Sequence, residues 1–225
     1  MQKKMTRQLK KWCGEFGRQY TDREDTDRGI CGPEKLDVFY KSMWGVPRSK
    51  MNREFLYPIK KDIFSVLEVG SNVGNQLVCL QSMGFKNLYG IEIQEYAVEK
   101  SKKFTKNINI VQGSAFDIPF KDKYFDMVFT SGVLIHIAPS DINVVLDEIY
   151  RCSNKYIWGF EYYADKYTEI NYRGNNNLLW KTDFCKLFLK RFKNLVLVKE
   201  KKFGYVDNDN VDSMFLLKKR SRTRE

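Results

Sequence analysis

The chain has 225 residues, of which 43% are hydrophobic and 15% aromatic; this suits one globular domain with an extension and excludes a disordered or collagen-like protein. No apolar run reaches the roughly 18 residues of a membrane span, and the five cysteines form no CxxC pair, so we expect a cytoplasmic protein without membrane insertion, disulfide framework or bound metal. The net charge of +11 lies mostly in residues 1–11 (+5) and 218–225 (+4), which argues against a nucleic-acid partner.

The first part of the chain carries aromatic residues at helical spacing. Trp12, Phe16 and Tyr20 recur every four residues, as on one face of a helix that packs on the core. Residues 33–46 predict a further helix, because Pro33 suits its first turn and apolar side chains then follow at helical spacing. We therefore expect a helical cap ahead of the first strand.

From Ile63 onward, short apolar strands alternate with helices, a pattern typical of a parallel sheet covered on both faces. The expected strands are residues 64–69, 87–93, 109–112, 125–130, 155–160, 195–199 and 214–217. The expected helices run from Asn72 to Gly84 and over residues 95–104, and two more begin at Ser140 and Thr182. Only a loop separates the last two strands, so they should pair antiparallel.

These elements predict an α/β protein with a Rossmann-like, seven-stranded, mostly parallel sheet and a reversed last strand. We assign the sheet and its helices to a core at residues 62–225, and the preceding helices to an N-terminal cap at residues 1–61.

Polar and glycine residues gather where the predicted strands end. Gly70 and Gly74 let the backbone pass close to a ligand at the carboxyl end of the first strand. Glu92 closes the second strand, where a carboxylate can accept hydrogen bonds from ribose hydroxyls. Residues 113–116 follow the third strand and residues 125–134 cover the fourth, so the order and spacing indicate a nucleoside-binding sheet.

From about Asp62 onward, this set resembles the class I S-adenosylmethionine (SAM) dependent methyltransferases. The resemblance implies SAM as the cofactor, S-adenosylhomocysteine as its product and no metal. It also implies that the glycine turn holds the methionine part of SAM, the second strand holds the ribose and the next turn flanks adenine. The implied cofactor contacts are Glu68, Gly70, Ser71, Asn72, Gly74, Glu92, Ile93, Ser114, Ala115, Ser131 and Gly132, with Trp12 from the cap. Asn72 and Ser114 depart from the family, which has glycine and aspartate there.

A narrower resemblance covers residues 12–23, 132–139 and 162–174, which are similar to the pseudaminic-acid-biosynthesis-associated methylases. It implies a small polar acceptor from bacterial surface-glycan biosynthesis, or alternatively a phosphonate-type acid. Arg23 and Arg173 could bind an anionic group by bidentate contacts, although a lone arginine is more often a surface residue.

The remaining candidates lie at the ends of the fourth and fifth strands and in the cap. Tyr162 and Tyr163 could bind the acceptor or simply pack. His136 could be a general base or could position its own loop, and Glu161 could act there or be a polar edge. Tyr20 is the third candidate for a catalytic group. A base is needed only if the acceptor must lose a proton.

Three other classes of protein remain as alternatives. An amide or exocyclic-amine methylase, including one acting on RNA or protein, carries Asx-Pro-Pro-aromatic after the fourth strand, whereas this chain has Thr-Ser-Gly-Val at residues 130–133. A nicotinamide oxidoreductase would need a G-x-G-x-x-G turn, which the first strand lacks. A catalytically silent protein with this fold, serving as a subunit, stays open.

Overall fold

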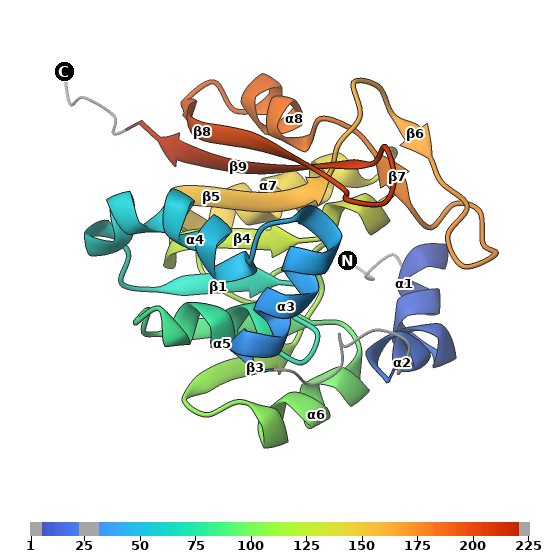
Figure 1. The fold of residues 1–225 in the computed structure, drawn as a ribbon, viewed down its shortest axis with the longest axis horizontal. Coiled ribbons are helices and arrows are strands. Elements are labelled where there is room, and N and C mark those ends of the chain that lie inside the picture. Colours follow the sequence, from blue (N-terminus) through green and yellow to red (C-terminus); the bar gives the residue numbers. More distant parts are fainter. Residues whose placement is uncertain (1–5, 23–31, 221–225) are drawn as a thin grey trace.

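The computed structural model describes residues 6–22 and 32–220 and contains one seven-stranded sheet (Figure 1). In spatial order its strands are β3 (Ile108–Gln112), β2 (Leu88–Glu92), β1 (Val66–Val69), β4 (Phe125–Ser131), β5 (Ser153–Tyr162), β9 (Val211–Lys219) and β8 (Leu195–Gly204). The first five are mutually parallel, and β9 runs antiparallel to both of its neighbours. The predicted fold class and the antiparallel pairing of the last two strands are confirmed.

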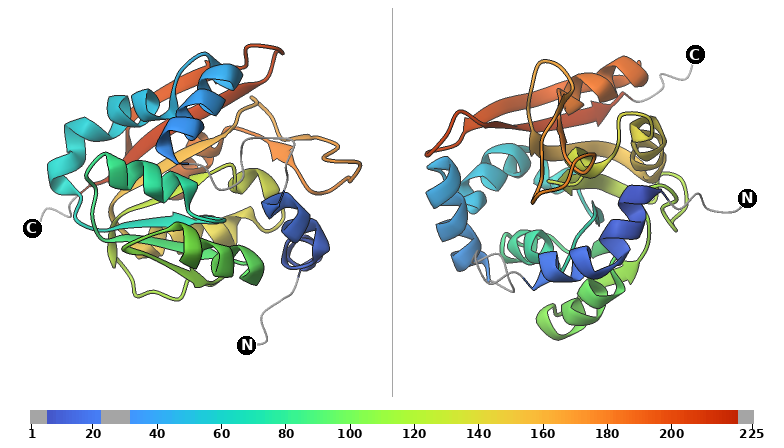
Figure 2. Two further views of the ribbon diagram at one scale, coloured as in Figure 1. Left: turned by 60° about the horizontal axis from the view of Figure 1, so that its bottom comes forward. Right: turned by 90° about the vertical axis from the view of Figure 1, so that its right-hand side faces the viewer.

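Helices cover both faces of the sheet, as the two turned views show (Figure 2). One face packs against α3 (Pro33–Trp44), α4 (Arg48–Leu56), α5 (Asn75–Ser82) and α6 (Glu95–Phe104), with the short helix η1 (Tyr57–Asp62) following α4. The other face packs against α7 (Ile142–Cys152) and α8 (Phe184–Arg191). Each face has its own buried apolar cluster, which explains why the central strands are apolar on both sides.

The segments before β1 occupy two different places. Leu36, Tyr40 and Trp44 of α3 are buried in the same cluster as Trp158 and Phe160 of β5, so α3 belongs to the layer on the sheet. Helices α1 (Arg7–Cys13) and α2 (Glu15–Thr21) lie instead beside the carboxyl ends of the strands (Figure 2). The division into a cap at 1–61 and a core at 62–225 stays a prediction.

The expected helix through Trp12 and Tyr20 is two short helices that meet at Gly14. Gly14 is extended, with φ −92° and ψ −159°, so the helix cannot continue through it. The side-chain amide of Gln94 donates hydrogen bonds to the carbonyl oxygens of Trp12 and Gly14, at 3.0 and 2.9 Å. These two hydrogen bonds from Gln94 therefore stabilise the break between α1 and α2.

The connection from β5 to α8 is long and contains a small hairpin. Its strands β6 (Thr168–Glu169) and β7 (Trp180–Lys181) pair antiparallel outside the main sheet.

None of the helices within residues 6–22 and 32–220 combines the length and the apolar character that a membrane-spanning helix needs.

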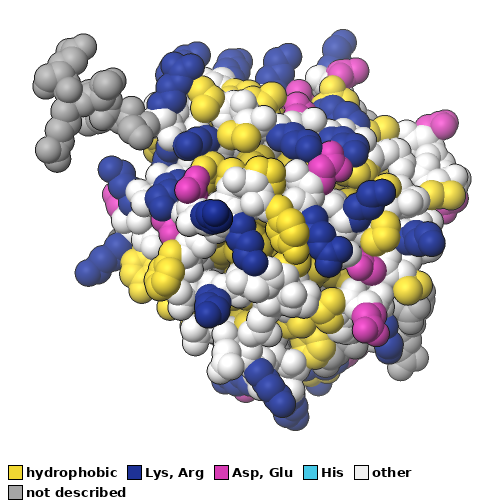
Figure 3. Space-filling view, turned by 60° about the vertical axis from the view of Figure 1, so that its left-hand side comes forward, with side chains coloured by type: hydrophobic (Ala, Val, Ile, Leu, Met, Phe, Trp, Pro, Cys, Tyr) yellow, Lys and Arg dark blue, Asp and Glu magenta, His cyan; other side chains and the backbone are white. Residues whose placement is uncertain are grey.

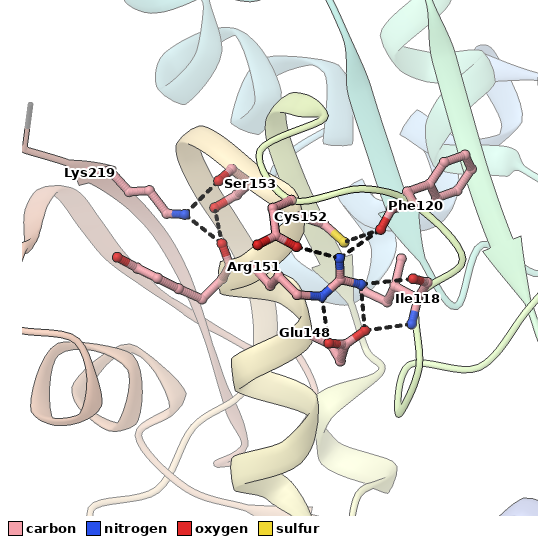
Figure 4. Close-up of polar contacts among 9 residues, drawn as sticks. Ile118, Phe120, Glu148, Arg151, Cys152, Ser153 and Lys219 are labelled. Carbon is pink, nitrogen blue, oxygen red and sulfur yellow. Dashed lines mark hydrogen bonds and ion pairs between the residues drawn. The ribbon is translucent and has the colours of Figure 1, made fainter. Parts of the chain in front are cut away.

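Hydrogen bonds from a charged side chain of α7 hold the turn that follows β3 (Figure 4). The guanidinium of Arg151 on α7 donates to the carbonyl oxygens of Ile118 and Phe120, at 2.9 and 2.7 Å, and to the carboxylate of Glu148. Glu148 in turn accepts the backbone N–H of Ile118 at 2.7 Å. The carboxylate raises the pKa of Arg151 above its ordinary value. Helix α7 therefore holds residues 118–120 of this turn in place.

Basic side chains are spread over the face of the molecule drawn in Figure 3, with acidic and hydrophobic side chains among them. Some of this charge is neutralised locally. Lys199 and Lys201 of β8 both form ion pairs with Glu54 of α4, at 2.9 Å each.

Candidate active site

A cavity of about 350 Å³ opens along the carboxyl ends of the parallel strands, a size typical of small-molecule sites. Open α/β sheets bind their ligands at this edge. Many of the residues singled out from the sequence meet there. They are Trp12, Tyr20, Glu68, Gly70, Ser71, Asn72, Glu92, Ile93, Ala115, Ser131, Gly132, His136, Glu161 and Tyr162.

Four other candidates do not line the cavity, and Arg23 lies outside the described residues. Gly74 belongs to the glycine turn but does not line the cavity. The Ser114 hydroxyl accepts the backbone N–H of Phe116 at 3.2 Å and also lies outside the lining. Tyr163 follows the end of β5, and its hydroxyl donates to Asp165 at 2.6 Å. Arg173 is exposed in a turn at φ +51°.

The glycine turn after β1 is a tight passage of backbone. Gly70 has φ +72°, and a Cβ there would lie 2.7 Å from Val133, so the loop after β4 could not approach. Gly74 begins α5 at φ +89°, where a Cβ would meet Ile110 at 2.7 Å. Asn72 stands between them at φ +47°, and asparagine is among the non-glycine residues that adopt this conformation most readily. Asn72 therefore preserves the conformation of the turn, although the family that the sequence resembles has a glycine at this position.

Glu92 ties the second strand to that turn. Its two carboxylate oxygens accept the backbone N–H groups of Asn72 and Gln94, at 2.8 and 2.9 Å. Burial raises the pKa of Glu92, and the backbone hydrogen bonds oppose that rise. Each carboxylate oxygen has a second lone pair, so both can still accept a hydroxyl hydrogen from a ligand in the cavity.

The buried polar atoms at the same end that have no hydrogen-bond partner among the described residues include Oε2 of Glu68 and Oγ of Ser71. Buried polar groups are normally satisfied, so these atoms indicate a place for a polar ligand. Burial raises the pKa of Glu68 well above its ordinary value, and the positive charge of Arg48 opposes the rise. Arg48 is fully buried, with its guanidinium about 5 Å from the rings of Tyr40 and Phe160.

The loop after β4 is held by a buried carboxylate. Glu161 accepts the backbone N–H groups of Val133 and Ile135, at 3.2 and 3.4 Å. Burial raises the pKa of Glu161 to about 7, while its hydrogen bonds with Thr130 and this loop oppose the rise. Val133 is the residue that packs on Gly70, so Glu161 sets the distance between the loop and the glycine turn.

His136 lines the cavity and is buried on the same loop. Its Nδ1 lies 2.8 Å from the carbonyl oxygen of Leu178. A carbonyl can only accept, so Nδ1 carries a hydrogen, and in the neutral imidazole the lone pair would be on Nε2. The imidazole packs at 4.6 Å from the ring of Trp12 and 5.3 Å from that of Tyr172.

Helices α1 and α2 bridge the cavity from α6 to the 172–177 loop. At the α6 end, Asp22 forms an ion pair with Lys100, and Tyr96 donates to Asp22 at 2.8 Å. Lys11 reaches Asn175 at the other end. Across the middle, the Asn72 amide donates to the Thr21 hydroxyl at 3.1 Å, which joins α2 to the glycine turn.

The opposite end of the cavity contains residues that sequence reasoning missed. They come from α3, α5, β5, the β6–β7 connection and the β8–β9 hairpin, and include Phe39, Tyr40, Trp44, Gln76, Phe160, Tyr172, Tyr205 and Asp212. The aromatic spacing of residues 33–46 predicted a buried helix face but gave no sign of a ligand site. Asp212 ends a run of polar residues at 207–212 that is typical of a hairpin tip, and only strand pairing could have placed it here.

One group of possible metal ligands exists among the described residues, and it lies apart from this cavity. It consists of Asp183, Cys185 and Glu200. Glu200 is already bound by Lys202 and by the Ser213 hydroxyl, at 2.6 and 2.7 Å.

Comparison with known families finds matches in the central part of the chain. A family model described as a methyltransferase domain matches residues 67–155. A curated protein of Botryococcus braunii, sterol methyltransferase-like 2, is 34% identical over 94 residues, which is 39% of this chain and 24% of that protein. The chain spans about a quarter of the length of the curated relatives it matches.

Solved structures resemble the chain over most of its length. One is the Burkholderia thailandensis 1,6-didemethyltoxoflavin-N1-methyltransferase with bound 1,6-didemethyltoxoflavin and S-adenosylhomocysteine: 12% identity, 91% of this chain, 83% of that chain and a TM-score of 0.63. Another is the magnesium protoporphyrin IX methyltransferase of Synechocystis PCC 6803 with bound SAM: 12% identity, 94% of this chain, 95% of that chain and a TM-score of 0.63. At these identities the likeness shows the fold.

Proposed function

We propose that this chain, which has the fold of class I SAM-dependent methyltransferases and a methyltransferase domain at residues 67–155, transfers a methyl group from SAM to a small polar acceptor. The observation that carries the proposal is the pairing of the glycine turn with Glu92. Both stand at one end of a single cavity, joined through the backbone of Asn72.

The residues at that end fit the groups of SAM. Glu92 has acceptor positions for the two ribose hydroxyls. The unpartnered Oε2 of Glu68 and Oγ of Ser71 suit a charged amino-acid group near the glycine turn. Ala115 and Phe116 offer apolar contact for a flat base. When bound, SAM would supply an activated methyl group with its own leaving group.

The protein then has to orient the acceptor and exclude water. Ser131 and Gly132 line the cavity where β4 ends, and Trp12 and Tyr20 reach it from α1 and α2. His136 could take a proton from a hydroxyl or an amine through Nε2, because Nδ1 is committed to Leu178. An acceptor that is already anionic would need no such base.

The narrower motif resemblance supports an acceptor from bacterial surface-glycan biosynthesis, such as a capsule or nonulosonic acid precursor, with a phosphonate-type acid as the alternative. The anionic character expected from Arg23 and Arg173 gains no support from the described lining, since Arg173 is exposed outside it. An RNA acceptor is not favoured either, because no lysine or arginine is found among the described residues of the cavity wall.

The decisive experiment is calorimetric titration with SAM, S-adenosylhomocysteine and, as the control, NAD, followed by transfer of a labelled methyl group from SAM to candidate acceptors. We expect both SAM and S-adenosylhomocysteine to bind and NAD not to bind. Binding of NAD in place of SAM would contradict the proposal.

A further inference from the structure

We propose that the phenol of Tyr40, with the buried guanidinium of Arg48 behind it, is a binding site for a carboxylate group of a ligand in this cavity. The carboxylate belongs either to the acceptor or to the methionine part of SAM, and separate probes distinguish these two sources. The inference rests on the proposed function, because it takes the glycine turn and Glu92 as the cofactor end.

Tyr40 lies where the two ends of the cavity meet. With SAM on the glycine turn and Glu92, the opposite end is left for the acceptor. This acceptor end is lined by Trp44, Phe160, Tyr162, Tyr205 and Asp212. The ring of Tyr40 stacks on that of Trp44 at 4.7 Å, while its hydroxyl contacts Gln76 on α5, the helix that follows the glycine turn. A ligand group beside the Tyr40 hydroxyl can therefore come from either end.

The Tyr40 hydroxyl has a hydrogen to donate. Its oxygen accepts side-chain N–H groups of Gln76, at 3.0 Å, and of Arg48, at 3.3 Å, which occupies both of its lone pairs. Tyr40 is only 6% exposed, and no described residue accepts its hydrogen. A turned Gln76 amide would accept it, but would then place its own N–H groups where its buried Oε1 now has no partner. In both orientations a buried donor lacks an acceptor, which a ligand can supply.

The charge behind Tyr40 is positive. Arg48 is fully buried, and its Nε and Nη2 atoms have no hydrogen-bond partner among the described residues. Its charge opposes the rise that burial causes in the pKa of Glu68, yet that pKa stays well above its ordinary value, which favours the neutral acid. A buried cation that no full negative charge compensates is costly. An anionic ligand group would therefore be stabilised here, although the described lining itself contains no lysine or arginine.

A ligand oxygen bonded to Tyr40 would lie close to this charge. The Tyr40 hydroxyl is 3.3 Å from Nη1 of Arg48, and an O–H···O bond to a carboxylate is about 2.6 Å long, so that oxygen would be at most about 6 Å from Nη1. Opposite charges at this distance attract strongly in a site closed to water. The hydrogen bond from Arg48 also polarises the phenol and strengthens the bond that the phenol donates.

The donors at this place match a carboxylate. The buried Nε1 of Trp44, whose ring stacks on that of Tyr40, is a second donor without a partner among the described residues. Two donors and one positive charge suit a group with two oxygens and a single negative charge. A phosphate group, with three oxygens and up to two negative charges, would be left with unsatisfied oxygens and excess charge.

The carboxyl groups of the lining carry less negative charge than their number suggests. Burial raises the pKa of three of them, to about 7 in the last case; they are Glu68, Glu92 and Glu161. Asp212 is hydrogen-bonded with Tyr205, and Asp141 precedes α7, which packs on the opposite face of the sheet from α3. The charged partner of the Tyr40 hydroxyl is Arg48.

The test compares two pairs of ligands, each pair differing in one carboxylate. The first pair is S-adenosylhomocysteine and its decarboxylated analogue. The second is N-acetylneuraminate, a nonulosonic acid, and its methyl ester, each added to protein saturated with S-adenosylhomocysteine. Calorimetry and ligand-observed NMR give the affinities. In at least one pair, wild-type protein should bind the carboxylate at least about ten-fold more tightly than its counterpart, and Tyr40→Phe should reduce that ratio to less than about three-fold.

The ratio within a pair is informative because both ligands meet the same protein, so a loss of folded protein affects both alike. Arg48→Met removes the charge but keeps the phenol, and should lower the same ratio. Circular dichroism checks the folding of this buried variant, and Tyr40→Phe decides the question if it does not fold. Tyr57→Phe, which removes the hydroxyl of an exposed tyrosine on η1, is the matched control and should leave both ratios unchanged.

A reduced ratio in the first pair would assign the carboxylate to SAM, and a reduced ratio in the second would assign it to the acceptor. A carboxylate preference that is absent from both pairs, or that Tyr40→Phe leaves unaltered, would overturn the inference. Failure of S-adenosylhomocysteine to bind wild-type protein would instead contradict the proposed function.

Discussion

The two ends of the cavity are built in different ways. At the cofactor end, the glycine turn, Glu92 and residues 113–116 follow one another along the chain on three adjacent strands. At the opposite end, which we propose as the acceptor end, Trp44, Tyr162 and Asp212 come from segments more than a hundred residues apart from first to last. The first end combines backbone turns with polar side chains that are close to them in sequence, and the second is made of side chains from distant segments. The second can therefore change by substitution while the first keeps its geometry.

Glu161 stands between the two ends, and it carries the largest effect that we expect. Its pKa in the folded protein is about 7, against an ordinary value of 4.5. Its protonated form is the one that folding favours, so its contribution to stability is complete below pH 4.5 and is lost as pH rises through 7. From pH 4.5 to 8, wild-type protein should lose about 3 kcal/mol relative to Glu161→Gln.

Urea unfolding at several pH values measures this difference, because titration of all other groups cancels between the two proteins. Parallel pH profiles for wild type and Glu161→Gln would show that the carboxyl is not buried against the loop at 133–135. The two ends would then be independent.

Glu92→Ala tests the cofactor end alone. The variant removes both ribose acceptors and frees the backbone N–H groups of Asn72 and Gln94, so S-adenosylhomocysteine binding should weaken by about 1.5–3 kcal/mol, roughly 10- to 150-fold. Calorimetry gives the affinity. Glu95→Ala, an exposed neighbour on α6, should leave it unchanged. An unaltered affinity for Glu92→Ala would remove the ribose from this position.

Gln94→Ala sharpens the comparison by loosening the helices that bridge the cavity. The variant loses two hydrogen bonds to the break between α1 and α2, so S-adenosylhomocysteine should dissociate up to about ten-fold faster. Stopped-flow displacement measures that rate. Gln112→Ala, which removes one exposed bond to Ile93, is the control. Equal dissociation rates in both variants would mean that α1 and α2 do not retain the ligand.

The smallest effect should come from the basic tail. Residues 218 and 219 belong to β9, and the Lys219 ammonium donates to the carbonyl oxygens of Tyr150 and Ser153. A truncation should therefore begin after Arg220. Removal of residues 221–225 should change methyl transfer by less than about two-fold, as surface changes usually do. A large loss of turnover together with lost RNA binding would favour a nucleic-acid acceptor.

Much of the cofactor end could be predicted because its signals are local. Strand, glycine turn and closing acid occur at short spacing, and each feature has a backbone reason that the structure retains, such as the left-handed conformations of Gly70 and Asn72. Neither the role of Gln94 nor the break at Gly14 follows from this spacing. Both depend on a contact between residues 80 positions apart.

The acceptor end could not be assembled from the sequence, because strand order decides it. Asp212 lines the cavity because β9 lies between β5 and β8 in the sheet. This strand order places Asp212 opposite Tyr162. Arg173 illustrates the converse. The motif around it suggested a contact with an anionic ligand, but the turn at residues 172–175 leaves its side chain exposed and outside the cavity lining.

The position of β9 also affects how the protein can be made. During synthesis, β1 to β5 and β8 are complete before β9 exists, so one edge of β5 and one of β8 stay unpaired until nearly the last part of the described chain emerges. Unpaired strand edges are sites of misassociation between chains. On a ribosome, the cofactor end can form early, whereas Asp212 arrives with the strand that closes the sheet. Completion of the acceptor end and protection of the nascent protein from aggregation are thus the same event.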